Sequence, residues 1–257
     1  GRANKVHSTE SFIGGSGNSA SGTATILYGQ ENIVYDEPNA DGGLCIGFKN
    51  VITNSKQFLC LGHANSGISG SILFGQSGFA SGGYAFSVGN KCSSFGNYTL
   101  AHGNSNKCSG NAAHAEGQRT SAVAGAAHSE GDRCIASGII SHTEGDGCYT
   151  YGRGSHAEGS GTSAKSIASH TEGRGTLSDT DYQHVEGQYN SPASDALKVI
   201  GNGTSNTSRS NVLEVYKNRI VANAPIYSTN IPSAPTANGT YTLKAVVNNG
   251  STAYSWS

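Results

Sequence analysis

Histidine and glutamate recur as a pair in the middle of this 257-residue chain, and both side chains can exchange protons or ligate metal ions. Each pair stands in the phrase His-x-Glu-Gly, and successive histidines are fourteen residues apart. Six of the nine histidines belong to this set, so it is a single repeated feature. The pairs are His114 and Glu116, His128 and Glu130, His142 and Glu144, His156 and Glu158, His170 and Glu172, and His184 and Glu186.

The spacing within each pair limits its chemistry. Residues two apart on a β-strand share one face, where His and Glu can act as acid and base, bind a cation, or form charge-assisted hydrogen bonds. An active site is normally formed once per chain, whereas this pair occurs six times. We therefore interpret the pairs as a structural polar ladder, and we expect no catalytic residue and no enzyme activity.

Bound ions are the alternative interpretation of the ladder. Three associated chains would bring three copies of each pair around a three-fold axis, where a cation could bind; no other cofactor is expected. If the imidazoles are instead protonated and paired with carboxylates, stability should fall at acidic pH as Glu is protonated. It should also fall at alkaline pH as His loses its proton.

A period of fourteen with glycine at every half-period predicts an all-β repeat structure. Twelve glycines between Gly89 and Gly187 fall on one grid of seven residues, and Ala124, Ser166 and Thr180 fill its gaps. Seven residues suit a short strand and a tight bend, which glycine makes without steric cost. One fourteen-residue coil is then two strands and two bends, and stacked coils form a parallel β-solenoid.

The phrase continues toward the N-terminus with apolar residues in place of His and Glu, as in Ile72-Leu-Phe-Gly75. The intervals between its first glycines are 18, 15 and 13 residues before they settle at 14. We divide the chain into a lead-in over residues 1–25, with a first coil at Ser11-Phe-Ile-Gly14, and a β-roll over residues 26–201. Its coils are apolar over 26–103 and carry His-x-Glu-Gly over 114–187.

The alternation within the phrase separates the inside of the solenoid from its surface. The middle residue is usually small and suits the lumen, while the residues on either side point outward. Large apolar residues at these outward positions would leave an apolar stripe on a monomer, and such stripes mark interfaces. The predicted partner is another copy of the chain, with three copies packed around a common axis as a homotrimer.

Composition and charge exclude several function classes. The net charge is −1 and there is no basic cluster, so nucleic acid is not an expected partner. No apolar run has the length of a membrane span, and no membrane insertion is expected. The six cysteines occupy small-residue positions of the repeat, which predicts buried free thiols, with a Cys134–Cys148 disulfide as the alternative.

The last part of the chain, residues 202–257, departs from the repeat. Residues 202–211 are rich in Ser, Thr, Asn and Gly, which is typical of a loop or cap. Residues 240–247 and 251–256 alternate on either side of Asn-Asn-Gly, which predicts a terminal β-hairpin. We expect this part to be a small C-terminal β cap and hairpin module.

The repeat resembles the head repeats of YadA-type trimeric autotransporter adhesins. Ser155-His-Ala-Glu-Gly159 places His and Glu where that family's Ser-Val-Ala-Ile-Gly has apolar residues, and this variant resembles repeats of phage and prophage tail fibres. The segments 200–211 and 239–256 are also similar to tail-fibre termini. The resemblance implies a left-handed parallel β-roll and an intertwined homotrimer.

The function implied by this resemblance is that of a non-enzymatic, trimeric tail-fibre or receptor-binding protein. It would sit in the tail of a virion or phage-tail-like particle, contact other tail or baseplate proteins, and attach to a bacterial surface glycan or protein. The candidate receptor contacts are Tyr35, Asp36, Tyr241, Tyr254 and Trp256.

Two further functions remain open. The first is the head of a trimeric autotransporter adhesin on a bacterial cell surface, which would bind host matrix. The second is a tailspike-type glycan hydrolase, which needs paired carboxylates in a groove. Outside the ladder the acidic residues are sparse. Neither Asp36, Glu37 and Asp41 nor Asp179 and Asp181 form a persuasive set.

Overall fold

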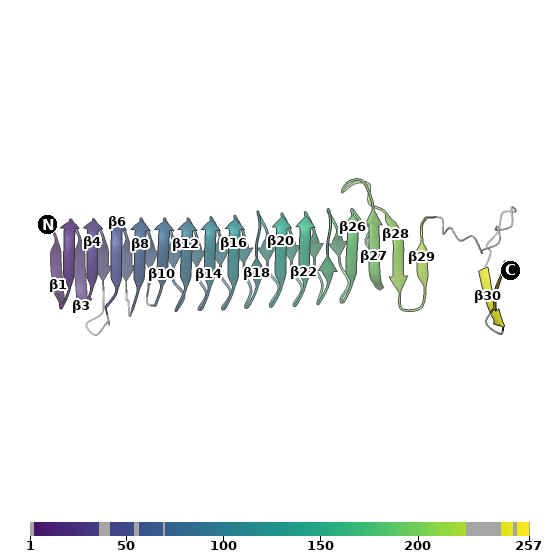
Figure 1. Ribbon diagram of the computed structural model, residues 1–257, viewed down its shortest axis with the longest axis horizontal. Helices are drawn as coiled ribbons and strands as arrows, with labels where there is room; N and C mark the ends of the chain where they lie inside the picture. Colours follow the sequence, from purple (N-terminus) through teal and green to yellow (C-terminus); the bar gives the residue numbers. More distant parts are fainter. Residues whose placement is uncertain are drawn as a thin grey trace. The chain divides into compact units, whose positions relative to one another are not determined.

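The computed structural model describes residues 3–35, 42–53, 57–68, 70–224, 243–248 and 251–256. These residues form strands and bends with no α-helix, and the chain divides into two compact units, Gly1–Val221 and Ala222–Ser257. In the first unit the coils follow one another in a row, each with one strand in each of two sheets (Figure 1). The predicted all-β parallel solenoid is confirmed, while its handedness and the trimer stay predictions.

The narrow sheet has thirteen strands, most of them only two residues long, and all the pairings of consecutive strands that are described are parallel. Its strands are β1 (Lys5–Thr9), β3 (Ser19–Thr23), β5 (Ile33–Tyr35), β7 (Val51–Thr53), β9 (Ser66–Gly67), β11 (Phe79–Ala80), β13 (Ser93–Ser94), β15 (Lys107–Cys108), β17 (Ser121–Ala122), β19 (Ile135–Ala136), β21 (Tyr149–Thr150), β23 (Ser163–Ala164) and β25 (Leu177–Ser178).

The wide sheet has sixteen strands and contains the histidine of every His-x-Glu-Gly phrase. Its strands are β2 (Phe12–Ser16), β4 (Ile26–Gln30), β6 (Leu44–Phe48), β8 (Leu59–His63), β10 (Ile72–Gln76), β12 (Phe86–Asn90), β14 (Leu100–Asn104), β16 (His114–Gln118), β18 (His128–Ser129), β20 (His142–Asp146), β22 (His156–Ser160), β24 (His170–Thr171), β26 (His184–Gln188), β27 (Ala196–Asn202), β28 (Asn211–Tyr216) and β29 (Ile220–Ala222).

The register of the wide sheet follows the repeat of the sequence. His142 pairs with His156, and Gly145 with Gly159, so equivalent residues of successive coils lie side by side. The early intervals of 18, 15 and 13 residues keep the same register, because the extra residues leave the strands aligned. The first coil is shifted by one residue from the sequence prediction: Gly15, and not Gly14, pairs with Gly29.

The lumen between the sheets is filled by the inward residues of both. The middle residue of the phrase is buried in every coil from β4 onward, as the alternation predicts, and it changes from Leu27 and Leu73 to Ala115 and Ala157 along the chain. Its equivalent in the first coil, Ile13, is partly buried. The opposite wall changes in the same way, from Val34 to Ala164. The early coils therefore have a large aliphatic core and the later coils a narrow one lined by Ala, Ser, Thr and Cys.

The glycine of the phrase recurs because the backbones of adjacent coils meet there. Gly145 has a φ of 107°, and a Cβ atom added to it would lie 2.1 Å from the carbonyl oxygen of Gly159. The same contact recurs with each following coil, as at Gly159 with Gly173. No side chain fits at this position without displacing backbone, which explains the strict fourteen-residue recurrence of glycine.

The parallel stack ends in antiparallel strands. β27 pairs in parallel with β26 but antiparallel with β28, and β29 follows β28 in the same sheet. The guanidinium of Arg209, in the loop between β27 and β28, donates to the carbonyl oxygens of Gly175 at 2.8 Å and Asn190 at 3.1 Å. The first unit thus continues beyond the expected boundary at residue 202. In the second unit β30 (Leu243–Asn248) pairs antiparallel with β31 (Ser251–Trp256), forming the predicted hairpin.

Candidate functional site

The His-x-Glu-Gly phrases form a continuous outward-facing stack on the wide sheet. The six histidine rings lie one above the other, with centroids 4.6–4.8 Å apart and planes within 3–11° of parallel. This spacing is the separation of neighbouring strands, so the register of the sheet sets the stack directly. The side chains of the stack are about one-third exposed in a single chain, for example 36% for His142 and 31% for Glu130. We call these twelve residues the His–Glu ladder.

Each histidine after the first contacts the glutamate of the preceding coil. The distance from Nε2 to the carboxylate oxygen is 3.6 Å for His128 and Glu116, and 3.5 Å for His142 and Glu130. Only His184 approaches as close as 3.0 Å, to Glu172, which is a hydrogen bond. Within one chain the histidines and glutamates therefore line up as a ladder, whose place in a trimer core stays a prediction. Its contacts join adjacent coils, and most of them are longer than an ordinary hydrogen bond.

The stacked carboxyl groups perturb one another. Hydrogen bonding to the carboxyl group of Glu144, with burial, raises the pKa of Glu130 to about 7, and it raises the pKa of Glu158 to about 7 in the same way. The same contacts lower the pKa of Glu144. Because these groups titrate as one coupled stack, the ladder holds protons to a pH well above that of an isolated glutamate.

The histidines are shifted toward the neutral form. Burial and the neighbouring imidazoles lower the pKa of His128 and of His156 below the usual value for histidine. His114 and His170 are affected in the same direction and for the same main reason. Neutral imidazoles remove the premise of protonated His–Glu pairs, so the loss of stability that such pairs would show at alkaline pH is not expected from these histidines.

Basic side chains are scarce along the ladder. In the described part of the chain, Lys198 forms an ion pair with Glu186 at 3.2 Å, at the C-terminal end of the stack. Arg119 and Arg133 lie at the bends beside the wide sheet, where they pair with Asp132 and Asp146 instead. The ladder therefore has a row of carboxyl groups whose described neighbours are mostly imidazoles and other carboxyl groups.

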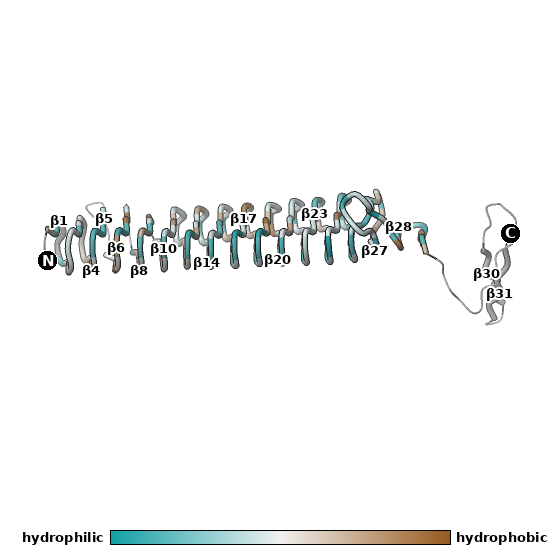
Figure 2. The backbone as a smooth tube through the Cα atoms, turned by 90° about the horizontal axis from the view of Figure 1, so that it is seen from above, coloured by the Kyte–Doolittle hydropathy of each residue, from teal (hydrophilic) through white to brown (hydrophobic). Residues whose placement is uncertain are grey.

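The outward positions of the earlier wide-sheet strands are apolar. Phe12 is 64% exposed, Ile26 48% and Tyr28 54%, and Phe74 lies edge-on to Phe86 with ring centroids 5.8 Å apart. In Figure 2 the coils labelled β4 to β10 carry hydrophobic colouring, and the lower edge of the coils from β14 to β20 is hydrophilic. The switch from apolar residues to His and Glu, predicted from the sequence, runs along a single face of the wide sheet. We call the apolar part of this face, from Phe12 to Leu100, the outer stripe.

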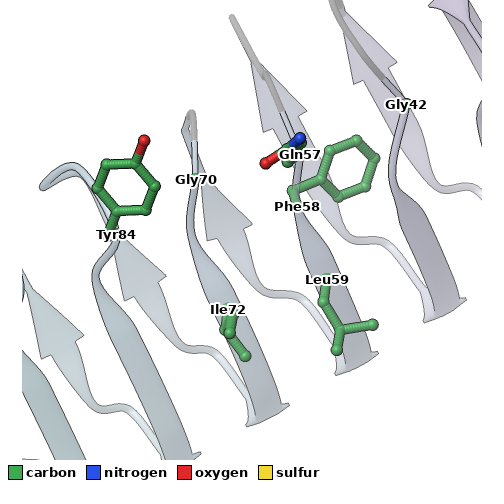
Figure 3. A pocket seen from close by; sticks show the side chains of 7 residues that line it. All are labelled: Gly42, Gln57, Phe58, Leu59, Gly70, Ile72 and Tyr84. Atoms are coloured by element: carbon green, nitrogen blue, oxygen red, sulfur yellow. The ribbon is translucent and has the colours of Figure 1, made fainter.

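A shallow pocket opens at the bends of the early coils. It has a volume of about 300 Å³ and is lined by Phe58, Tyr84, Leu59 and Ile72 among others. Figure 3 shows the rings of Phe58 and Tyr84 on either side of Gly70, whose missing side chain leaves room between them. The lining is mainly apolar and contains no acidic pair, so the pocket does not supply the carboxylates that a glycan hydrolase needs.

A ladder of buried asparagines escaped the sequence analysis. Asn32 donates through Nδ2 to the carbonyl oxygen of Gly47 at 2.7 Å and accepts the backbone N–H of Asn50 at 3.1 Å. Asn50 repeats the first of these bonds to Gly62 at 2.8 Å. The signal was present, since asparagine recurs three residues after the glycine of the phrase. The members that bond in this way are Asn18, Asn32, Asn50, Asn65 and Asn106.

Cysteine takes the same position in three coils, at Cys92, Cys134 and Cys148. The Sγ of Cys134 accepts the backbone N–H of Cys148 at 3.4 Å and lies 3.4 Å from the carbonyl oxygen of Gly145. All six cysteines are buried and free, which confirms the predicted thiols and leaves Cys134 and Cys148 without a disulfide. These side chains are thus structural parts of the bend.

The candidate receptor contacts are not brought together as a described site. Tyr35 ends β5 and is 53% exposed. Asp36 and Tyr241 lie outside the described residues, and for Tyr254 and Trp256 only the backbone of β31 is described. Their role in binding stays a prediction.

Comparisons with known proteins do not assign the chain to a family. No protein-family model matches the sequence, and no curated protein matches it either. The described residues contain no helix with the length and apolar character needed to span a membrane. Fold and site geometry are therefore the basis for a functional proposal.

Proposed function

We propose that this protein is a non-enzymatic, trimeric fibre segment of a phage tail or phage-tail-like particle that attaches to a bacterial surface. The observation that carries the proposal is the outer stripe, where large apolar side chains lie exposed on consecutive coils of one face. A soluble chain rarely leaves a continuous apolar surface of this kind uncovered. Association of copies through the stripe removes it from water.

Self-association suits this surface better than a different partner. The outward residues repeat with the coils, so a second copy in register presents the same pattern along the same length. In the later coils the stripe changes to the His–Glu ladder, whose polar groups must meet polar groups across an interface. An apolar section beside a polar section fixes the axial register of the copies, because a slip would place apolar side chains against carboxyl groups.

The length of the coil stack supports a role as a spacer that also carries receptor contacts. The twelve intervals between Gly29 and Gly201 give a stack of roughly 60 Å at the usual strand separation. A stack of this length holds a terminal module away from its attachment point. Three copies would present three equivalent receptor contacts, and their joint binding compensates for weak affinity at each one.

Light scattering on matched variants tests the trimer. The purified chain should have the mass of three copies, and Ile26→Asp, on the outer stripe, should give monomers. Ile167→Asp is the control, because Ile167 is 46% exposed and Ile26 48%, but Ile167 lies at a bend away from the stripe. A monomeric wild-type chain, or equal behaviour of the two variants, contradicts the proposal.

Cell binding tests the attachment. The labelled trimer should decorate one group of bacteria and lose that binding once the surface polysaccharide is stripped. Binding to collagen or mammalian cells, with no binding to bacteria, would instead give the protein the function of an adhesin head. A trimer that binds no surface would reduce the proposal to a spacer.

A further inference from the structure

We propose that the His–Glu ladder binds divalent transition-metal ions, with zinc as the best fit, between adjacent coils of a single chain. The inference goes beyond the proposed fibre and does not depend on it, because all the ligand atoms come from one copy. Each ion would be held by imidazole nitrogens and carboxylate oxygens of neighbouring phrases.

The separations between these ligand atoms suit a shared ion better than a direct hydrogen bond. Nε2 lies 3.5 Å from the carboxylate oxygen for His170 and Glu158, and 3.6 Å for His128 and Glu116. A good N–H···O bond spans 2.7–3.2 Å. Two ligand atoms bound to one tetrahedral zinc ion at about 2.1 Å are roughly 3.4 Å apart. The His–Glu distances therefore need an adjustment of only a few tenths of an ångström to accept an ion, whereas the stacked imidazoles of one group, 4.6–4.7 Å apart, must tilt toward each other to share it.

The histidine nitrogens that face these carboxylates have no hydrogen-bond partner. The Nε2 atoms of His128, His142, His156 and His170 are buried from solvent and make no hydrogen bond. A buried polar atom without a hydrogen bond is destabilising, and its recurrence on four consecutive coils calls for a ligand. A metal ion supplies one, since neutral imidazole binds zinc through this nitrogen.

Grouping the ligand atoms sets the number of ions. Four groups of three residues have their ligand atoms within 4.8 Å of one another. Two of these four groups share His128 and cannot bind an ion at the same time, so one chain holds at most three ions. The groups are His114, Glu116 and His128; His128, Glu130 and His142; His156, Glu158 and His170; and Glu172, His184 and Glu186.

Charge and access also favour a cation. A groove of about 390 Å³ runs beside Glu116, Glu130 and Glu144, and another of about 340 Å³ beside Glu144, Glu158 and Glu172. Both grooves are bordered by carboxyl groups and glycine backbone, and the first also by His102, which leaves room for an ion to approach. Along this row the described ion pairs with lysine or arginine involve only Glu186. A divalent ion would offset the repulsion between carboxylates that lie one coil apart.

The ligand types select the class of metal. Magnesium and calcium prefer sets made of oxygen atoms alone, whereas a mixed set of imidazole and carboxylate suits zinc. The six cysteines are the competing zinc ligands in the chain. They are fully buried in the lumen, on the other side of the wide sheet from the ladder.

Metal retention by the full-length protein is the first measurement. The protein is stripped with a chelator, incubated with zinc chloride, passed through a desalting column and analysed for bound metal. Between one and three zinc ions per chain are expected, and magnesium chloride should leave none. Light scattering on the same samples records the assembly state, so a failure of the trimer and a failure of metal binding are distinguishable.

The test variants replace histidines by glutamine. His128→Gln, His156→Gln and His184→Gln together remove a ligand from all four groups, so zinc retention should fall below one tenth of the wild-type value. The control changes two histidines away from the ladder, His7→Gln and His63→Gln, and should retain zinc as the wild type does. His102 is left unchanged in both variants because it lines the groove beside Glu116. No zinc on the wild type, or equal retention by the triple variant and the control, overturns the proposal.

X-ray absorption at the zinc edge keeps the proposal testable if a variant fails to fold, because it uses the wild-type protein. A first shell of nitrogen and oxygen at about 2.0–2.1 Å, with imidazole scattering, is the expected result. A sulfur shell at about 2.3 Å would place the ion on the cysteines and overturn the assignment to the ladder.

Discussion

Ile140 has a backbone conformation that β-branched residues rarely adopt. Its φ is 57°, and the equivalent bend residue is glycine in the next coil, Gly154 with a φ of 65°. The left-handed conformation costs a residue with a Cβ atom about 1–2 kcal/mol. At the residue scale, a bend can therefore hold a residue other than glycine, but this lowers the stability of its coil.

Ile140→Gly should raise stability. It relieves the left-handed strain, and the greater freedom of glycine in the unfolded chain offsets about 0.5–1 kcal/mol of that gain, so we expect a net increase of roughly 0.5 kcal/mol. The control is Ile139→Gly, since Ile139 is equally exposed, at 55% against 58%, but is not among the residues with positive φ. The midpoints of thermal or denaturant melts should rise for Ile140→Gly and fall for Ile139→Gly. A loss of stability in both variants would contradict the proposed strain at Ile140.

The carboxyl stack predicts a pH dependence of stability. The folded pKa of Glu130 and Glu158 is about 7, above the value near 4.3 of an unfolded glutamate. A carboxyl group whose pKa is raised by folding stabilises the folded chain fully below about pH 4.3. That contribution is lost as the pH rises through 7. The histidines act in the opposite sense: their lowered pKa gives stability above the unfolded value near 6.5, which is lost at lower pH.

Glu130→Gln with Glu158→Gln separates the two contributions, because glutamine mimics the protonated carboxyl group. In buffer with a chelator, the double variant should melt near the wild-type temperature at pH 5 and several degrees above it at pH 8. Glu10→Gln, at an exposed residue outside the ladder, should follow the wild type at both values. A difference between double variant and wild type that is the same at pH 5 and pH 8 would rule out shared protons in the stack.

At the scale of the element, the sequence predicted the coil but not its hydrogen bonding. Glycine recurrence and the alternation of apolar and small residues give the strands, the bends and the identity of the lumen residues, because both patterns follow directly from backbone geometry. The buried asparagines of the bends, such as Asn32 and Asn50, were missed. Asparagine is common in exposed turns, and only the stacked coils show that its amide bridges two of them.

Gly145→Ala tests the backbone contact between coils. The new methyl group would lie about 2.1 Å from the carbonyl oxygen of Gly159, so the coils must separate, and we expect a loss of more than about 2 kcal/mol. Gly147→Ala is the control two residues away, where φ is 63° and the added atom meets nothing within 4 Å. That variant should lose only about 1 kcal/mol. Equal losses of stability in urea melts would show that glycine is required at position 145 for its backbone conformation, and not because adjacent coils come too close for a side chain.

At the scale of the whole first unit, stability is a sum over neighbouring coils. Each wide-sheet strand pairs with the strand before it and the strand after it, as β20 does with β18 and β22. The fourteen-residue period allowed the sequence to predict this arrangement over most of the unit. The position of its end could not be predicted, because β28 and β29 extend the sheet without repeating the phrase.

Deletion of whole coils should preserve the fold. Removing residues 142–169 takes out two coils and joins Ser141 to His170, which has the same place in the register as His142. The variant should fold, shorten by roughly 10 Å in X-ray scattering and lose little thermal stability. Removing residues 142–162 instead joins Ser141 to Ser163, a residue of the narrow sheet, and should prevent cooperative folding. A folded product from both deletions would contradict strict register.

The chain of each coil runs across the stack, and this has a mechanical consequence. A pull on the two ends of the first unit acts along the direction in which the coils are hydrogen-bonded, so tension falls on one boundary between coils at a time. When a coil detaches it releases fourteen residues, about 46–50 Å of extended chain, for each step of roughly 5 Å lost from the stack. Force spectroscopy on a single chain should therefore give a regular sawtooth with this increment. A fibre built on such coils lengthens stepwise under load before it breaks.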